Sequence, residues 1–179
     1  MTPKEISEIF TIWALNWPNA ELYQGGEQML DLRCKIFAEH LSDVDYWDGL
    51  QGAAYSLKTR KFAPNIAEFR EDIEMARRKI QGEINEGYSA LRNGYLIAKR
   101  LGKPTDEFIK HLPRRTQTVL RVMGGLEAFA PPDSPTFNYD GFIQTYMTLL
   151  RKRNALTGDR FKELPAGAKA LPEKKGNES

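Results

Sequence analysis

Basic side chains gather in four short clusters in the second half of the chain, with aromatic rings between them in the sequence. The clusters comprise Arg77, Arg78 and Lys79; Lys99, Arg100 and Lys103; Arg114, Arg115 and Arg121; and Arg151, Lys152 and Arg153. The rings are those of Tyr88, Tyr95, Phe137 and Tyr139. Clustered cations bind the phosphates of a single nucleic-acid strand while rings stack on its bases, or they bind an acidic protein surface. We predict a partner-binding surface here, and stabilisation of helix ends by these cations is the alternative.

The chain offers few residues that could carry out catalysis or hold a cofactor. No GxxxxGK[ST] motif occurs, because Gly102-Lys103 lacks both the upstream glycine and the following hydroxyl. The two histidines, His40 and His111, and the single cysteine, Cys34, have no second metal ligand at a usual spacing. No pair of acidic residues lies in an apolar context that would separate two carboxyl pKa values. We therefore expect a protein that is not an enzyme and uses neither a cofactor nor a metal.

Charge is distributed unevenly, although the formal net charge is only +2. Residues 1–57 hold 3 basic and 9 acidic side chains, whereas residues 58–179 hold 23 and 15. This asymmetry favours two surfaces with different partners, and two solvated faces of one bundle are the alternative. No apolar run approaches the roughly 20 residues that span a bilayer, and the N-terminus has no signal-peptide pattern. With a single cysteine, these features predict a soluble cytoplasmic protein that does not bind membranes.

Apolar residues recur every three or four positions, which predicts an all-α fold that begins with a small N-terminal helical bundle. Thr2 and Pro3 begin a first helix, and Trp17-Pro18-Asn19 ends it. The apolar stripes expected in its three helices are Ile6, Ile9, Phe10, Trp13 and Trp17; then Met29, Leu32, Ile36, Phe37 and Leu41; then Tyr46 or Trp47, Leu50, Ala53, Ala54 and Leu57. Core packing is the expected role of the tryptophans, and a partner contact is the alternative.

The stretch Lys58–Arg70 predicts the junction between this bundle and a long fourth helix. Asn65 can cap the helix while Glu68 reaches back to the Asn65 amide, which together form a capping box. Pro64 disfavours helical backbone at the residue before it, so the third helix must end by Lys61 or Phe62. Pro64 and Phe69 occupy the positions of a hydrophobic staple.

The fourth helix would be about 55 Å long if it continued unbroken to Leu101, which is longer than a three-helix bundle can cover. Because Gly82, Gly87 and Gly94 each lower helix stability, we expect a kink or break near Gly82–Gly87. The far half would then pair with C-terminal segments or with a second copy of the chain in a homodimer. Its expected stripe is Ile66, Phe69, Ile73, Ala76, Ile80, Ile84, Tyr88, Leu91, Tyr95 and Ala98.

The remaining chain predicts a C-terminal helical region followed by a disordered tail. Helices are expected at Thr105–His111, Pro113–Met123 and Asp140–Asn154, with Phe142, Tyr146, Leu149 and Leu150 buried in the last. From Gly158 the chain has little to bury. The expected domains are an N-terminal bundle at 1–81, a helical partner-binding region at 82–157 and the tail at 158–179.

The N-terminal part resembles the family of phage-encoded loaders and inhibitors of the bacterial replicative helicase. The likeness covers Ile6–Arg70, which is somewhat more than a third of the chain. It rests on the turn Trp17-Pro18-Asn19, the Leu-x-Asp-x-Asp-Tyr element from Leu41 to Tyr46, the residues Ala53, Ala54 and Leu57, and the stretch Lys61–Arg70. Members of this family carry a flexible C-terminal part that contacts helicase, whereas this chain has a long part that looks helical.

The resemblance implies a non-catalytic adaptor that binds the replicative hexameric helicase and loads or inhibits it during phage or prophage DNA replication. The basic second half would bind the helicase and, in addition, single-stranded DNA. The acidic bundle would face an origin-binding replication protein or solvent. One alternative is a stand-alone phage protein that binds single-stranded DNA or has a regulatory role, and a second is a phage structural adaptor or assembly chaperone.

Overall fold

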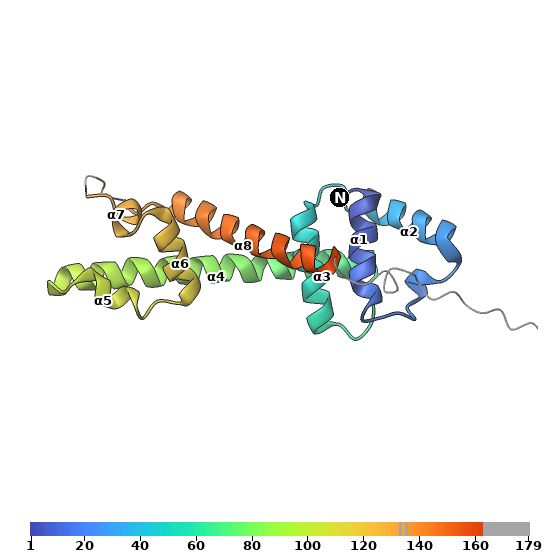
Figure 1. Cartoon of the computed structure of the whole chain (residues 1–179), viewed down its shortest axis with the longest axis horizontal. Helices are drawn as coiled ribbons and strands as arrows, with labels where there is room; N and C mark the ends of the chain where they lie inside the picture. Colours follow the sequence, from blue (N-terminus) through green and yellow to red (C-terminus); the bar gives the residue numbers. More distant parts are fainter. Residues whose placement is uncertain (133, 135, 163–179) are drawn as a thin grey trace, which may run out of the picture. The chain divides into compact units, whose positions relative to one another are not determined.

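The computed structural model of this chain is helical throughout its described part, which comprises residues 1–132, 134 and 136–162, without the side chains of Asp106 and residues 153–162. No strand occurs among these residues, so the predicted all-α class is confirmed. Figure 1 shows the helices in chain order. They are α1 Pro3–Ala14, the 3₁₀ helix η1 Glu21–Tyr23, α2 Gly26–His40, α3 Tyr46–Thr59, α4 Ile66–Leu101, α5 Thr105–Ile109, α6 Arg114–Met123, α7 Leu126–Phe129 and α8 Tyr139–Lys162.

The chain forms two compact units, one containing Met1–Arg78 and the other Lys79–Thr157. The sequence placed the boundary between its first two domains after residue 81. Helix α4 contributes its first part to the first unit and the rest to the second. The first unit carries 9 basic and 13 acidic side chains and the second 12 and 7, so the two units have opposite net charges.

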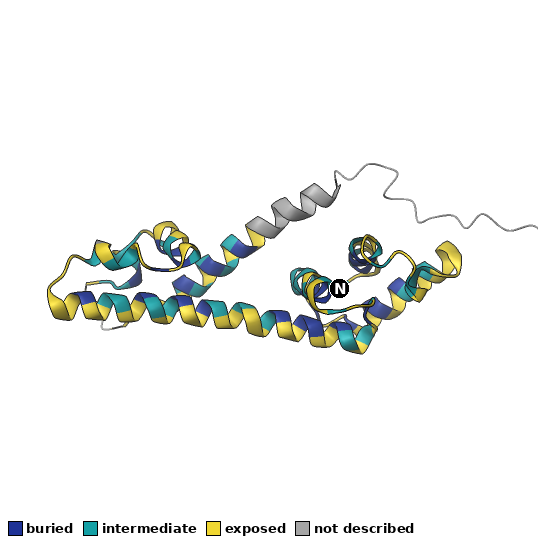
Figure 2. Ribbon diagram, turned by 90° about the horizontal axis from the view of Figure 1, so that it is seen from below, coloured by how far each residue is buried: buried dark blue, intermediate teal, exposed yellow. Residues whose placement is uncertain are grey.

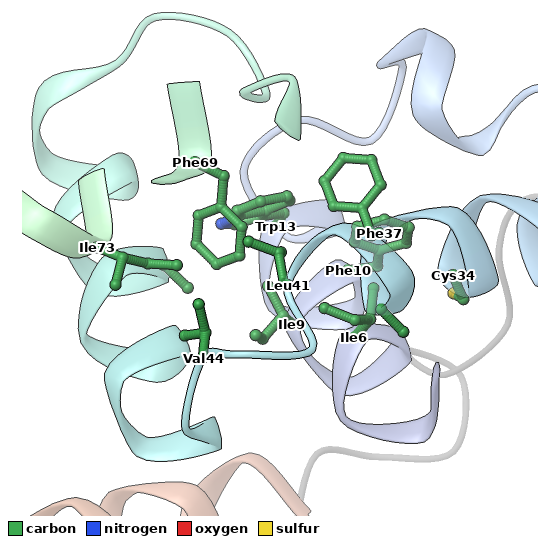
Figure 3. Packing of buried hydrophobic residues seen from close by; sticks show 12 residues of the cluster. Ile6, Ile9, Phe10, Trp13, Cys34, Phe37, Leu41, Val44, Phe69 and Ile73 are labelled. Carbon is green, nitrogen blue, oxygen red and sulfur yellow. The ribbon is translucent and has the colours of Figure 1, made fainter. Parts of the chain in front are cut away.

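The core of the first unit forms where α1 packs against α2, α3 and the start of α4. Four residues of α1, Ile6, Ile9, Phe10 and Trp13, are almost completely buried. Figure 3 shows the Trp13 ring beside Phe69, and the two ring centroids are 4.7 Å apart at a nearly perpendicular angle. The Trp13 indole N–H has no hydrogen-bond acceptor in the described part of the chain.

The predicted face of α2 is confirmed at Phe37 and Leu41 and wrong at its other three positions. Met29, Leu32 and Ile36 are 42%, 49% and 40% exposed, so they form an apolar stripe that no helix of this unit covers. The buried residues of α2 and of the turn after it are Cys34, Phe37, Ala38 and Leu41. Apolar residues surround much of α2, so periodicity alone could not select the face that packs against α1.

Helix α3 approaches its neighbours closely through small residues, and Tyr46, Leu50 and Leu57 of its predicted stripe pack, partly buried, against the core. Gly49, Gly52, Ala53 and Ser56 are buried, whereas Ala54 is exposed. A Cβ atom on Gly52 would lie 2.4 Å from Cγ1 of Ile73 on α4. The two helices are therefore too close for a side chain at position 52.

The junction between α3 and α4 has the predicted capping box. The Asn65 side-chain oxygen accepts from the Glu68 amide at 2.9 Å, and the Glu68 carboxylate accepts from the Asn65 amide at 2.8 Å. Both positions of the predicted staple, Pro64 and Phe69, are buried. Helix α3 ends at Thr59, before the limit that Pro64 sets.

A buried carboxylate, that of Asp72, fixes this junction to both helices. Asp72 is 3% exposed and its Oδ2 accepts from the Ser56 hydroxyl and from Arg60 Nε, each at 2.6 Å. Arg60 also donates to the Glu68 carbonyl at 3.0 Å and lies 3.1 Å from the Glu68 carboxylate. The hydrogen bond to Asp72 raises the pKa of Arg60, so the guanidinium stays charged.

Helix α4 is a single unbroken helix of 36 residues, so the expected break near Gly82–Gly87 is wrong. Ile84, Leu91 and Ala98 are buried along the side that faces the rest of the second unit, and exposed residues gather on the other side (Figure 2). Two of its glycines allow close packing. A Cβ atom at Gly87 would lie 2.7 Å from Thr116 Oγ1, and one at Gly94 would lie 2.4 Å from Phe108 Cδ2. Packing against α5, α6 and α8 outweighs the low helix propensity of these glycines.

The C-terminal helices occur where the sequence placed them, with different ends. Helix α5 ends at Ile109. Helix α6 begins at Arg114 with Pro113 at its N-cap position and ends at Met123, and the C-cap residue Gly124 has a φ of +104° that favours glycine. Helix α8 continues to Lys162, beyond the expected start of the tail at Gly158. A single glycine costs only about 1 kcal/mol in a helix, and the next proline in the sequence is Pro165. The rest of the expected tail lies outside the described residues.

Replacing Asp72 by alanine should lower the free energy of unfolding of the first unit by about 2–3 kcal/mol, because Arg60 and Ser56 lose their buried acceptor. Urea unfolding followed by tryptophan fluorescence measures this, since all three tryptophans lie in this unit. Asp31→Ala removes an exposed ion pair with Lys35 and should cost less than about 0.5 kcal/mol. Equal losses in the two variants would contradict the role of Asp72.

Alanine substitutions in α4 should have opposite effects at two glycines. Gly82 has no neighbour within 4 Å, so Gly82→Ala should stabilise the helix by about 0.5–1 kcal/mol. Gly94→Ala should destabilise it, because the new methyl group would overlap the Phe108 ring. Thermal unfolding followed by far-UV circular dichroism compares the two. A higher Tm for Gly94→Ala than for the unaltered chain would show that the contact is not tight.

Candidate interaction surface

Two of the predicted partner-binding arginines are held by carboxylates of their own unit. Arg77 donates to Asp48 through Nε at 2.9 Å and through a terminal nitrogen at 2.7 Å, and its other terminal nitrogen lies 2.5 Å from Glu74. The bonds to Asp48 tie α4 to α3 and raise the pKa of Arg77. Arg77 therefore serves the packing of the first unit.

Arg115 is the second arginine that is held internally. It donates to the Glu83 carboxylate and, at 3.2 Å, to the Tyr146 hydroxyl, which itself donates to Glu83 at 3.2 Å. The guanidinium also lies over the Tyr146 ring, 5.7 Å from its centroid. Hydrogen bonding to Tyr146 and the charge of Glu83 raise the pKa of Arg115. These three residues connect α4, α6 and α8 of the second unit.

The aromatic residues that the sequence placed between the basic clusters pack against one another. The Tyr88 ring contacts Phe129, Tyr139 and Phe142, with centroid distances of 5.6, 4.7 and 5.8 Å. The ring centroids of Phe137 and Tyr95 are 5.7 Å apart, and the Arg92 guanidinium lies over the Phe137 ring. The Tyr139 hydroxyl donates to Asn85 at 3.2 Å. These contacts hold α7 and α8 on α4, so most of these ring faces are occupied and not free to stack on bases.

The remaining cations of the predicted set are exposed. Arg78, Lys79, Lys99, Arg100, Arg114, Arg121, Arg151 and Lys152 all belong to this group. In the described part of the chain no carboxylate pairs with Arg78, Lys79, Lys99, Arg100, Arg114, Arg121 or Lys152. The side chain of Arg153 lies outside the described residues. These exposed cations belong to three different helices, α4, α6 and α8, so they are considered helix by helix.

The exposed side of α6 is the clearest of these surfaces, and we call Arg114, Thr118 and Arg121 the α6 face. These residues follow one another at i, i+4 and i+7, which places them on one side of a helix. The helix contains three arginines and no acidic residue. Two of the arginines occupy its first turn, where the helix dipole disfavours positive charge, and no side chain caps this end. Glu83 neutralises Arg115, and Arg114 stays uncompensated.

A second basic surface lies near the end of α4. Arg92, Leu96 and Lys99 share one side of the helix at i, i+4 and i+7, and Arg100 adjoins them. Leu96 is 42% exposed, so this surface combines cations with an apolar side chain. Such a combination suits a protein partner better than a phosphate backbone alone.

Most residues of the predicted N-terminal motif help to hold the first unit together, whereas the Phe62 side chain is largely exposed to solvent. Trp17 is half-buried and donates from Nε1 to the Lys61 carbonyl at 3.1 Å, and Trp47 is half-buried on α3. Pro18 is exposed in the turn after α1. Phe62 is 72% exposed, and Lys61 lies over its ring. The pattern Lys61-Phe62 gave no sign of this exposure, because an aromatic residue beside a helix end is usually buried.

The α6 face can bind anions through the guanidinium groups of Arg114 and Arg121, which no carboxylate pairs with in the described part of the chain. In the described part of the chain no three side chains of the metal-binding types converge. Nor does any helix there have the length and apolar character needed to cross a membrane. Comparisons of the chain with protein-family models, with curated proteins and with solved structures find no match.

Removing Arg115 should destabilise the second unit more than removing its neighbour. Arg115→Ala leaves Glu83 without its cation and Tyr146 without one hydrogen bond, and we expect a loss of about 1 kcal/mol in unfolding free energy. Arg114→Ala removes an exposed side chain without a charged partner and should change it by less than about 0.5 kcal/mol. Urea unfolding followed by far-UV circular dichroism measures both. A larger loss for Arg114→Ala would mean that this residue has a structural role.

Proposed function

We propose that this protein is a non-catalytic adaptor that binds a bacterial replicative hexameric helicase and loads or inhibits it. The second unit makes the contact with the helicase, principally through the α6 face. The first unit, which is acidic, faces an origin-binding replication protein or solvent. This proposal joins the resemblance of Ile6–Arg70 to phage helicase loaders and inhibitors with the charge of the two units.

The observation that carries the proposal is the uncompensated charge of the α6 face. Arg114 and Arg121 are exposed on a helix without acidic residues, in a unit where basic side chains outnumber acidic ones by 12 to 7. Exposed, unpaired charges of one sign contribute little to stability, but they accelerate and orient association with a surface of the opposite sign. An acidic patch on a large protein assembly is the kind of partner that this face fits.

The resemblance rests on residues that have well-defined places in the first unit. Leu41, Ala53 and Phe69 belong to its core, and Asn65 with Glu68 caps α4. The residues shared with the family are thus mainly those that build the helical unit. They support a common scaffold, and the helicase contact is inferred from the second unit.

The test is binding of the full chain to a purified replicative helicase. Co-elution in size-exclusion chromatography at micromolar concentration and low salt is expected for the unaltered chain. Arg114→Glu combined with Arg121→Glu should raise the dissociation constant for the helicase by about tenfold or more, because two attractive contacts become repulsive. The matched control is Lys4→Glu combined with Lys58→Glu, which changes the net charge equally through exposed lysines of the first unit.

Three outcomes distinguish the candidate functions. No co-elution of the unaltered chain would remove the helicase proposal. Equal weakening by the two double variants would mean that net charge, and not the α6 face, sets the affinity. A labelled single-stranded oligonucleotide without helicase forms the other arm, and binding there with a steep salt dependence and no helicase binding would favour the single-strand-binding alternative.

A further inference from the structure

A small cleft opens between α4, α6 and α8 of the second unit, beside the Glu83–Arg115–Tyr146 contact. Its volume is about 240 Å³, enough for the end of one long side chain, and it is partly open to solvent. The lining residues are Glu83, Glu86, Gly87, Pro113, Arg115, Thr116 and Tyr146. Lys79–Thr157 contains all of them, so the cleft belongs to one unit.

The cleft presents hydrogen-bond acceptors that the protein itself does not use. Thr116 is only 2% exposed, yet its hydroxyl has no hydrogen-bond partner in the described part of the chain. Glu86 is exposed at the rim and pairs there with no cation of the described residues. The Thr116 hydroxyl lines the cleft and is not among the fully buried unpaired atoms, so a ligand that donates a hydrogen bond to it would take the place of water there.

Gly87 gives the cleft its shape. Its position on α4 leaves the Thr116 hydroxyl next to bare backbone, where a Cβ atom would lie 2.7 Å from Thr116 Oγ1 and 3.6 Å from the Phe142 ring. Any larger residue at position 87 would therefore crowd the floor of the cleft. The expected weakness of this glycine in a helix interior is compensated by the close approach that it allows.

We propose that this cleft binds one guanidinium group, the side chain of an arginine on a partner protein. Two carboxylates and one guanidinium line the cleft, so its formal net charge is negative within a unit that is otherwise basic. A planar guanidinium offers five donors in a fixed fork, which can reach the Glu86 carboxylate, the free lone pairs of Glu83 and the Thr116 oxygen together.

An anionic ligand fits the cleft less well. The only cation in its lining, Arg115, already donates to Glu83 and Tyr146, and a bound anion would have to displace Glu83 while it approached Glu86. The proposed arginine leaves the existing contacts in place. This inference concerns a different surface from the α6 face, and it holds whether or not the partner is a helicase.

The probe is a blocked Gly-Arg-Gly tripeptide, and its control ligand is the same peptide with citrulline, which keeps the shape and removes the charge. Titration of the full chain, followed by the backbone amide signals in NMR spectra, should show saturable shifts at Gly87 and Thr116. We expect a dissociation constant on the order of millimolar, as for a single charged contact near a surface. The citrulline peptide should bind at least about threefold more weakly.

Two substitutions and one matched control locate the site. Glu86→Gln and Thr116→Val should each weaken binding by about threefold or more, and Glu127→Gln, at an exposed glutamate of α7 outside the cleft, should leave it unchanged. An unaltered Tm for Glu86→Gln would show that the fold is intact. The proposal is overturned if no saturable shift occurs, if citrulline binds equally well, or if Glu127→Gln weakens binding as much as Glu86→Gln.

Discussion

The first unit depends on the buried carboxylate of Asp72. Taking a carboxylate out of water costs several kcal/mol unless charged and hydrogen-bonding groups surround it. Arg60 from the junction and Ser56 from α3 each donate a hydrogen bond to Asp72 at 2.6 Å. Because Asp72 lies on α4, these two bonds fix the end of α3 and the turn after it against the start of α4. The capping box of Asn65 and Glu68 acts on the same turn, and Glu68 also contacts Arg60. These contacts hold the start of α4, which carries Phe69, against the core around Trp13.

The second unit is organised differently, by close approach and by rings. Gly87 and Gly94 let Thr116 and Phe108 approach the α4 backbone, and the aromatic contacts of Tyr88 and Phe137 hold α7 and α8. Hydrogen bonds among Glu83, Arg115 and Tyr146 connect α4, α6 and α8. The unit thus packs its rings against one another and holds Arg115 in an internal contact, and it leaves the cations of the α6 face exposed.

Much of this organisation could be predicted from the sequence. The helical class, the capping box and the buried stripe of α4 follow from local patterns, because each depends on residues within one or two turns. The exposed stripe of α2 could not be predicted, since apolar residues on two of its sides leave the choice to tertiary packing. The unbroken α4 was missed for a related reason: a glycine lowers helix propensity whether or not another helix packs against it. Of the predicted cations, Arg77 and Arg115 proved to have partners far away in the sequence, in Asp48 and Glu83, which no spacing rule reveals.

The spacing between α3 and α4 has a consequence for how this chain can vary. At Gly52 even a methyl group would meet Ile73, so the position admits no substitution unless the two helices separate. Phe62 lies on the surface of the same unit, and most polar residues there would leave packing untouched. Random variation that preserved only folding would therefore keep the glycine and gradually lose the ring. An aromatic side chain retained at position 62 would therefore indicate that a binding partner contacts it, because folding does not require it.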